Sequence, residues 1–259
     1  MIPNAARFLG RADDYVRYRP SYPGAAIDAI FESLSEPHQL DVLDVGAGTG
    51  ISTALLRSRG ARVVGIDPNG EMREKALANG LDVREGSAEA TGFSAARFDV
   101  VASFQAFHWF ATPEVLAEFA RILRPGGRVA LVWNERDDRD PFTNAYGVHV
   151  DNLRDRMAIA MRATVGSDTG PEKVAALLID SPFRCVRHAA FPNFQRLDWN
   201  GVVGRIRSAS YTPTQGEEHV RMMRGVKSAF DAHADRDGFV RFVMRTDVIV
   251  GDLPTAQTA

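Results

Sequence analysis

The feature that most constrains this chain is a short apolar strand that runs directly into three closely spaced glycines. Residues 42–50 read Val-Leu-Asp-Val-Gly-Ala-Gly-Thr-Gly, and a helix-like segment begins at Ile51. A strand that ends at glycines and restarts as a helix brings bare backbone N–H groups and a helix N-terminus close to a ligand. The segment therefore predicts a binding site at the end of this strand.

The spacing of the glycines narrows the kind of ligand. A dinucleotide fingerprint, G-x-G-x-x-G, needs its third glycine where Ile51 stands, but the third glycine here is Gly50. A phosphate-binding P-loop would need Gly-Lys-Ser/Thr, which this segment lacks. The spacing therefore argues against NAD, FAD and ATP.

Strands and helices alternate regularly between residues 40 and 134. The expected strands are 40–46, 62–67, 81–85, 98–104 and 128–134, and the expected helices between them are 50–59, 69–78 and 112–123. The strands are continuous apolar runs, which are typical of a parallel sheet covered by helices on both faces. In such sheets ligands bind beyond the carboxyl ends of the strands, where the strand order reverses.

The alternation is less regular in the second half of the chain. Residues 135–182 and 197–211 are expected to be mainly helical, and strands are expected at 183–191 and 239–250. Within 197–211, Trp199, Val202, Val203 and Ile206 recur at helical spacing, which indicates a helix packing face.

The charge and the cysteine content exclude several classes of protein. The 259 residues carry 31 basic and 33 acidic side chains, which gives no electrostatic footprint for nucleic acid or an anionic membrane. No run of 18 apolar residues predicts a membrane span, and the N-terminus lacks the apolar core of a signal peptide. The single cysteine, Cys185, fits a reducing cytoplasm, and no cluster of metal-ligating residues suggests a metal site. We therefore expect a cytoplasmic protein without metal, nucleic-acid or membrane partners.

Further residues stand where a nucleoside ligand would need them. Asp67 ends the second expected strand, and its carboxylate can accept hydrogen bonds from both hydroxyls of a ribose. Gly86-Ser-Ala-Glu89 follows the third strand, Ser103-Phe-Gln-Ala-Phe-His-Trp-Phe110 follows the fourth, and Arg124-Pro-Gly-Gly127 leads into the fifth.

With these four features in order, the chain resembles a class I S-adenosylmethionine-dependent methyltransferase over residues 40–134. Two further segments, Tyr15-x-x-Tyr-Arg-Pro-Ser-Tyr-Pro23 and Gln105-Ala-Phe-His-Trp109, resemble a small-molecule subgroup that includes the trans-aconitate methyltransferase-like enzymes. The resemblance implies a three-layer, doubly wound, Rossmann-like α/β fold. Its mostly parallel sheet would have seven strands, the last of them antiparallel, together with a helical cap.

The resemblance also implies a division of the chain. The expected parts are an N-terminal lid and helix (1–38), a cofactor-binding core (39–134), the end of the sheet with an inserted substrate cap (135–253), and a frayed tail (254–259). The strands expected at 183–191 and 239–250 would complete the sheet.

The resemblance assigns the cofactor, S-adenosyl-L-methionine, to particular residues. Its methionine part would lie over Gly46, Ala47, Gly48, Thr49 and Gly50, and its methionine end would be approached by Phe104 and Gln105. Asp67 would hold the ribose. The adenine would lie against Pro68, and its edge would face Ser87 and Ala88. Ser87 departs from the commoner pattern, in which an aspartate stands at that position.

Candidate acceptor residues come from several segments. His108 is the candidate base or orienting group, and with Trp109 it could instead line the pocket or pack the loop. Tyr15, Tyr18 and Arg19 could form a lid, with Arg19 on a carboxylate of cofactor or substrate, or else a surface arm. The remaining candidates are Trp133 and Asn134 at the end of the fifth strand, and Trp199, Arg207 and Tyr211 in the cap.

The leading hypothesis is a methyltransferase for a small molecule, with O-methylation of a carboxylate or hydroxyl slightly ahead of N- or C-methylation. Alternatives are a cofactor-binding scaffold or regulatory partner without turnover, a nucleic-acid methyltransferase, and a dehydrogenase. Ile51 disfavours the dehydrogenase, and the fourth strand leads into Ser-Phe-Gln-Ala rather than the Asn/Asp-Pro-Pro-Tyr/Phe turn of base-methylating enzymes. The expected state is a monomer or a homodimer.

Overall fold

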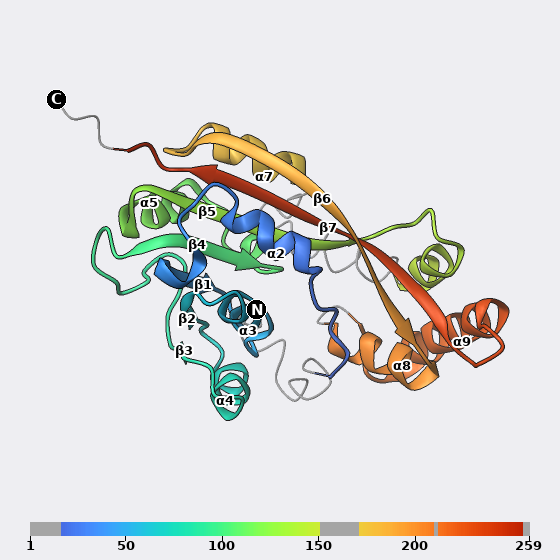
Figure 1. Ribbon diagram of the computed structural model, residues 1–259. Coiled ribbons are helices and arrows are strands. Elements are labelled where there is room, and N and C mark those ends of the chain that lie inside the picture. The colour runs from blue at the N-terminus through green and yellow to red at the C-terminus, as the bar shows by residue number, and fades with distance from the viewer. Residues whose placement is uncertain (1–16, 151–170, 210–211, 256–259) are drawn as a thin grey trace. The chain divides into compact units, whose positions relative to one another are not determined.

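The structure is a computed structural model that describes residues 17–150, 171–209 and 212–255 (Figure 1). The chain divides into two compact units. Unit 1 comprises Met1–Pro20, Asn134–Ser167 and Pro192–Arg245, and unit 2 comprises Ser21–Trp133, Asp168–Phe191 and Thr246–Ala259. The glycine turn therefore belongs to unit 2, and most of the segment expected to form a cap belongs to unit 1.

The strands form one seven-stranded sheet in the order β3-β2-β1-β4-β5-β7-β6 (Figure 1). They are β1 (Asp41–Val45), β2 (Arg62–Ile66), β3 (Val83–Arg84), β4 (Phe98–Phe104), β5 (Leu123–Arg136), β6 (Arg184–Leu197) and β7 (Val240–Asp252). The prediction of a doubly wound sheet with seven strands is confirmed.

The sheet is parallel except at β7. β1 pairs in parallel with β2 and β4, β2 with β3, and β4 with β5. Near the start of β5, the Leu253 N–H donates to the Gly127 carbonyl at 2.7 Å, whereas beyond its end the Asp137 N–H donates to the Val243 carbonyl at 3.1 Å. Because the partner numbers fall as β5 advances, β7 runs antiparallel to β5.

Helices cover both faces of the sheet in unit 2. They are α2 (Gly24–Phe31), α3 (Ile51–Ser58), α4 (Gly70–Ala78), α5 (Pro113–Ile122) and α7 (Pro171–Ile179), with short 3-10 helices η2 (Pro37–Gln39) and η3 (Phe107–Trp109). On one face Leu116 and Phe119 of α5 and Leu178 of α7 pack in a first core cluster with residues of the sheet. On the other, Ile27 of α2 and Leu56 of α3 pack in a second cluster. The covered faces explain why the strands read as continuous apolar runs.

Local capping sets where the helices of unit 2 begin. The Thr112 side chain accepts the Val115 N–H at 3.3 Å ahead of Pro113, and the Asn69 side chain accepts the Met72 N–H at 3.2 Å at the start of α4. β3 is shorter than the expected 81–85, since β2 pairs with it only at Val83 and Arg84.

Unit 1 has a core of its own. Residues 141–150 are helical, and α8 (Trp199–Ser208) and α9 (Gly216–His233) follow later in the chain. Buried side chains from these helices, among them Tyr146, Ile206 and Val226, pack around Phe242 in a third core cluster. The helix expected over 197–211 is shorter at both ends, because the Asp198 side chain caps its start and α8 ends at Ser208. Among the described helices, none is both long and apolar enough to cross a bilayer.

The first prediction concerns Gly46, where β1 turns away from the sheet. Its φ is +73°, and a Cβ built there would lie 2.5 Å from the Ala106 Cβ. Gly92 has a similar φ of +77° with no atom within 4 Å of such a Cβ, so it is a matched control. Both Gly→Ala changes strain the backbone, but only Gly46→Ala also forces two chain segments apart. We expect Gly46→Ala to lower the free energy of unfolding by about 1–3 kcal/mol more than Gly92→Ala. Urea unfolding of both variants checks this, and equal losses would show that the contact with Ala106 relaxes freely.

Candidate functional site

The strand order reverses between β1 and β4, and the carboxyl ends of these two strands place the candidate site. The Ser103 hydroxyl of β4 donates to the Val45 carbonyl of β1 at 2.9 Å, which joins the two strand ends. β1 then enters the glycine turn, and β4 ends at Phe104, one residue before Gln105. Gln105 has a φ of +50°, a strained conformation for a residue other than glycine, of the kind that costs about 1–3 kcal/mol and is concentrated at functional sites.

The three glycines of the turn have different reasons for being glycine. All have a positive φ: +73° at Gly46, +58° at Gly48 and +85° at Gly50. Gly46 lies too close to Ala106 for a side chain, and a Cβ at Gly50 would lie 2.4 Å from the Leu81 side chain. At Gly48, in contrast, a Cβ would meet nothing within 4 Å. The middle of the turn therefore has free space above its backbone.

Asp67 lies beside this turn at the end of β2. One carboxylate oxygen accepts the Gly48 N–H at 2.9 Å, and the other accepts the Asn69 N–H at 2.8 Å. Burial raises the pKa of the Asp67 carboxyl, while these two N–H groups and the charge of Arg73 oppose the increase. The carboxylate is thus held in a fixed orientation and still has lone pairs for two further donors.

Asp44, which the sequence reading did not single out, is fully buried in β1 two residues before the turn. One of its carboxylate oxygens accepts the hydroxyls of Ser52 at 2.6 Å and Thr53 at 2.7 Å. Burial raises the pKa of Asp44 to about 6, the two hydroxyls act against this, and the negative charge of Asp67 adds to it. The hydrogen bonds tie β1 to the first turn of α3 across the glycines. In the sequence, the two hydroxyl residues Ser52 and Thr53 shortly after the turn could have indicated that Asp44 accepts their hydrogen bonds.

The other proposed cofactor residues differ in their exposure and in the groups that they can present to a ligand. Pro68 is exposed and Ser87 half-buried, whereas the side chains of Ala47 and Ala88 are buried and can offer only backbone. The Thr49 hydroxyl is buried and has no partner among the described residues. Phe104 is buried against Tyr22, with ring centroids 4.9 Å apart. These positions remain proposals for cofactor contacts.

Three candidate acceptor residues belong to unit 2. His108 and Trp109 are half-buried in η3, with ring centroids 4.9 Å apart. Trp133 is 3% exposed and part of the first core cluster, and its indole N–H has no hydrogen-bond partner among the described residues. Its burial agrees better with an ordinary core position than with a residue facing the acceptor.

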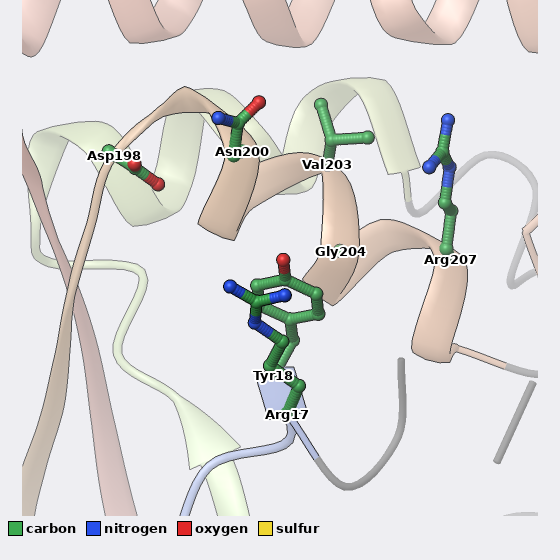
Figure 2. Close-up of a pocket in the computed structure, with 7 residues that line it drawn as sticks. All are labelled: Arg17, Tyr18, Asp198, Asn200, Val203, Gly204 and Arg207. Carbon is green, nitrogen blue, oxygen red and sulfur yellow. The ribbon is translucent and has the colours of Figure 1, made fainter. Parts of the chain in front are cut away.

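Two other candidates, far apart in the sequence, meet in unit 1. Tyr18 and Arg207 line one cavity of about 340 Å³ (Figure 2). Arg17 and Asn200, which the sequence reading did not single out, line the same cavity. Arg17 directly precedes Tyr18 in the sequence. Asn200 lies seven residues before Arg207, on the same face of the helix. Their positions in the sequence could therefore have made both of them candidates.

Three other candidates of unit 1 that the structure describes do not line this cavity: Trp199, Asn134 and Arg19. Trp199 packs against α9, with its ring 5.5 Å from that of Phe230. Asn134 accepts a hydrogen bond from the Asn193 amide at 3.0 Å, and Arg19 is half-buried. Tyr15 and Tyr211 lie outside the described residues. Within the described residues, no group of three or more His, Cys, Asp or Glu side chains could hold a metal ion.

Comparisons with known proteins agree with this geometry. Residues 43–131 match the family model of a methyltransferase domain. An uncharacterised methyltransferase of Mycobacterium tuberculosis is 39% identical over 151 residues, which are 56% of this chain and 60% of that protein. The match therefore spans less than two thirds of that relative's length.

Two solved structures share the fold. The YcgJ protein of Bacillus subtilis has a TM-score of 0.58 at 19% identity, over 90% of this chain and 100% of that one. The Haemonchus contortus phosphoethanolamine N-methyltransferase 2, solved with phosphomonomethylethanolamine and S-adenosylhomocysteine, has a TM-score of 0.61 at 14% identity, over 98% of this chain and 61% of that one. The fold is thus that of the class I, Rossmann-like methyltransferases, and residues 43–131 match the model of a methyltransferase domain.

The second prediction uses the raised pKa of Asp44. In the unfolded chain this carboxyl titrates near its ordinary value of 3.8, and in the folded protein it titrates near 6. Above pH 6 the folded state carries a buried charge, so stability falls as the pH rises from about 4 to about 6. Asp44→Asn removes this dependence. We expect the variant to gain about 2 kcal/mol relative to the wild type between pH 4.5 and pH 7.5.

Chemical unfolding at the two pH values measures this difference, and the comparison between them cancels any effect of the substitution that does not depend on pH. Asp180→Asn, at an exposed aspartate, is the control and should show no such gain. A gain of equal size in both variants would contradict a raised pKa at Asp44.

Proposed function

We propose that this protein is an S-adenosylmethionine-dependent methyltransferase that acts on a small molecule. The methyltransferase domain at 43–131 and the shared fold support the reaction class. The observation that carries the proposal is the Asp67 carboxylate, fixed by the Gly48 and Asn69 N–H groups beside an open glycine turn.

The residues at this turn fit S-adenosylmethionine. A carboxylate has about four lone-pair sites, and the two backbone N–H groups occupy two of them, so Asp67 can still accept both ribose hydroxyls. The free space above Gly48 leaves room for the methionine part. Pro68 and Ser87 would contact the adenine, with the backbone of Ala88, and Phe104 and Gln105 would lie at the methionine end. Arg19 would meet a carboxylate of the cofactor or substrate.

The bound cofactor supplies a methyl group already activated on a sulfonium, so the chain has to align the acceptor and exclude water. Such alignment contributes up to about 7–11 kcal/mol to lowering a barrier. A general base is needed only when the acceptor is protonated at the working pH. His108 is the residue we propose for that step or for orienting the acceptor, and Trp109 would line the pocket beside it.

The acceptor we propose is a small molecule, with O-methylation of a carboxylate or hydroxyl slightly favoured over N- or C-methylation, as in the trans-aconitate methyltransferase-like subgroup. Its support is the pair of short motifs at Tyr15–Pro23 and Gln105–Trp109 and the balanced charge of the chain. The same balance argues against nucleic acid and membranes as partners. We propose a cytoplasmic monomer or homodimer.

The third prediction tests the cofactor site. Asp67→Ala removes the proposed ribose acceptor, and Asp180→Ala removes an exposed carboxylate elsewhere in unit 2. We expect calorimetry to give micromolar binding of S-adenosylmethionine and S-adenosylhomocysteine, weakened at least about tenfold in Asp67→Ala. Asp180→Ala should bind like the wild type.

Three results separate the hypotheses. Absence of binding by the folded wild type would refute the methyltransferase function. Equal affinity in the wild type and Asp67→Ala would refute the ribose contact. Binding without methyl transfer to any carboxylate, phenol or amine in a screen would favour the cofactor-binding scaffold.

A further inference from the structure

Helix α8 has one face in the core and an adjacent face that lines a cavity. Val202 and Ile206 are buried in the third core cluster, which Trp199 borders. The adjacent face presents Asn200, Val203, Gly204 and Arg207, at the i, i+3, i+4 and i+7 positions of one helical stripe. This stripe lines the cavity of about 340 Å³, together with Arg17, Tyr18 and Asp198 (Figure 2).

Tyr18 forms a fixed wall of this cavity. Its ring lies directly on the bare backbone of Gly204, where a Cβ would be only 2.1–2.4 Å from three ring atoms. The Tyr18 carbonyl accepts the Gln195 side-chain amide at 3.1 Å, and the Arg205 guanidinium orients that amide by donating to its oxygen at 2.5 Å. The Arg17 guanidinium carbon lies 5.4 Å from the centroid of the Tyr18 ring, and Figure 2 shows both side chains below α8.

The charged groups of the cavity have opposite signs at different places. Arg17 and Arg207 bring two positive charges, and Figure 2 shows the Arg207 side chain extending away from Arg17 on the other side of α8. Asp198 brings one negative charge, and one of its oxygens accepts the Gly201 N–H at 2.7 Å as the cap of α8. No partner of its other oxygen is found among the described residues, so this oxygen can accept a hydrogen bond from a ligand. The cavity therefore suits a molecule that has both an anionic group and a hydrogen-bond donor.

We propose that this cavity is a binding site for a small molecule with one anionic group, a carboxylate or a phosphate, and one donor group such as an ammonium or a hydroxyl. Arg17 binds the anion, with a planar guanidinium group that matches its oxygens, and Asp198 accepts from the donor. This binding does not depend on the proposed function.

The experiment uses the full chain without cofactor and three chemically defined probes. 5-Aminopentanoate carries an anion and an ammonium, glutarate has a similar length with two anions, and 3-aminopropyl phosphate replaces the carboxylate by a phosphate. NMR titration gives the dissociation constants. We expect 5-aminopentanoate to bind about threefold or more tightly than glutarate, because Asp198 repels the second anion, and Asp198→Asn to abolish this preference.

The arginine variants test the anion contacts. Arg17→Gln should weaken the amino-acid probe at least about fivefold, whereas Arg207→Gln, on the other side of α8, and Arg236→Gln, at an exposed arginine outside the cavity, should each have a smaller effect. Gly204→Ala displaces the Tyr18 ring and should weaken the probe as well. If 5-aminopentanoate binds more tightly than 3-aminopropyl phosphate, the anionic group of the ligand is a carboxylate, and the reverse order indicates a phosphate.

Two outcomes would overturn the proposal. One is equal probe binding by Arg17→Gln, Arg207→Gln and Arg236→Gln. The other is no saturable binding of any probe to the wild type. Because each variant is also titrated with S-adenosylmethionine, unchanged cofactor affinity beside lost probe binding locates the effect in the cavity. If the wild type does not bind the cofactor, the proposed function is refuted, but the measured binding of the probes to the cavity is unaffected.

Discussion

The arrangement of the candidate site depends on the close approach of two chain segments at the end of β1. Gly46 lies so near Ala106 that no Cβ fits between them, and the loop after β4 can reach the glycine turn only because of this. The same turn uses left-handed backbone at Gly48 to direct its N–H to Asp67. The steric contact at Gly46 thus brings the loop after β4 to the end of β1, and the hydrogen bond from Gly48 joins the end of β2 to the same turn.

This arrangement places two carboxylates close to each other in a poorly solvated region. Asp44 and Asp67 each have a pKa raised by burial, and the charge of one raises the pKa of the other. Hydroxyls of α3 hold Asp44, and backbone N–H groups hold Asp67. The buried charge costs stability at neutral pH, but it keeps both groups oriented before any ligand arrives.

In unit 1, the single helix α8 both packs in the core and lines the cavity. The period of an α-helix puts Val202 and Ile206 into the core and leaves Gly204 and Arg207 on an adjacent stripe. Because Gly204 has no side chain, the ring of Tyr18, some 190 residues earlier in the chain, can lie directly on the helix backbone.

Strand periodicity, glycine spacing and helix caps are local properties, and from them the sheet, the glycine turn and Asp67 could be predicted. Tyr18 and Arg207 were also predicted from the sequence as candidate site residues. The cavity that these two residues share and the burial of Trp133 in the core could not be predicted in this way. Such outcomes depend on which surfaces distant segments present to each other, and that is settled by packing rather than by the residues of any one segment.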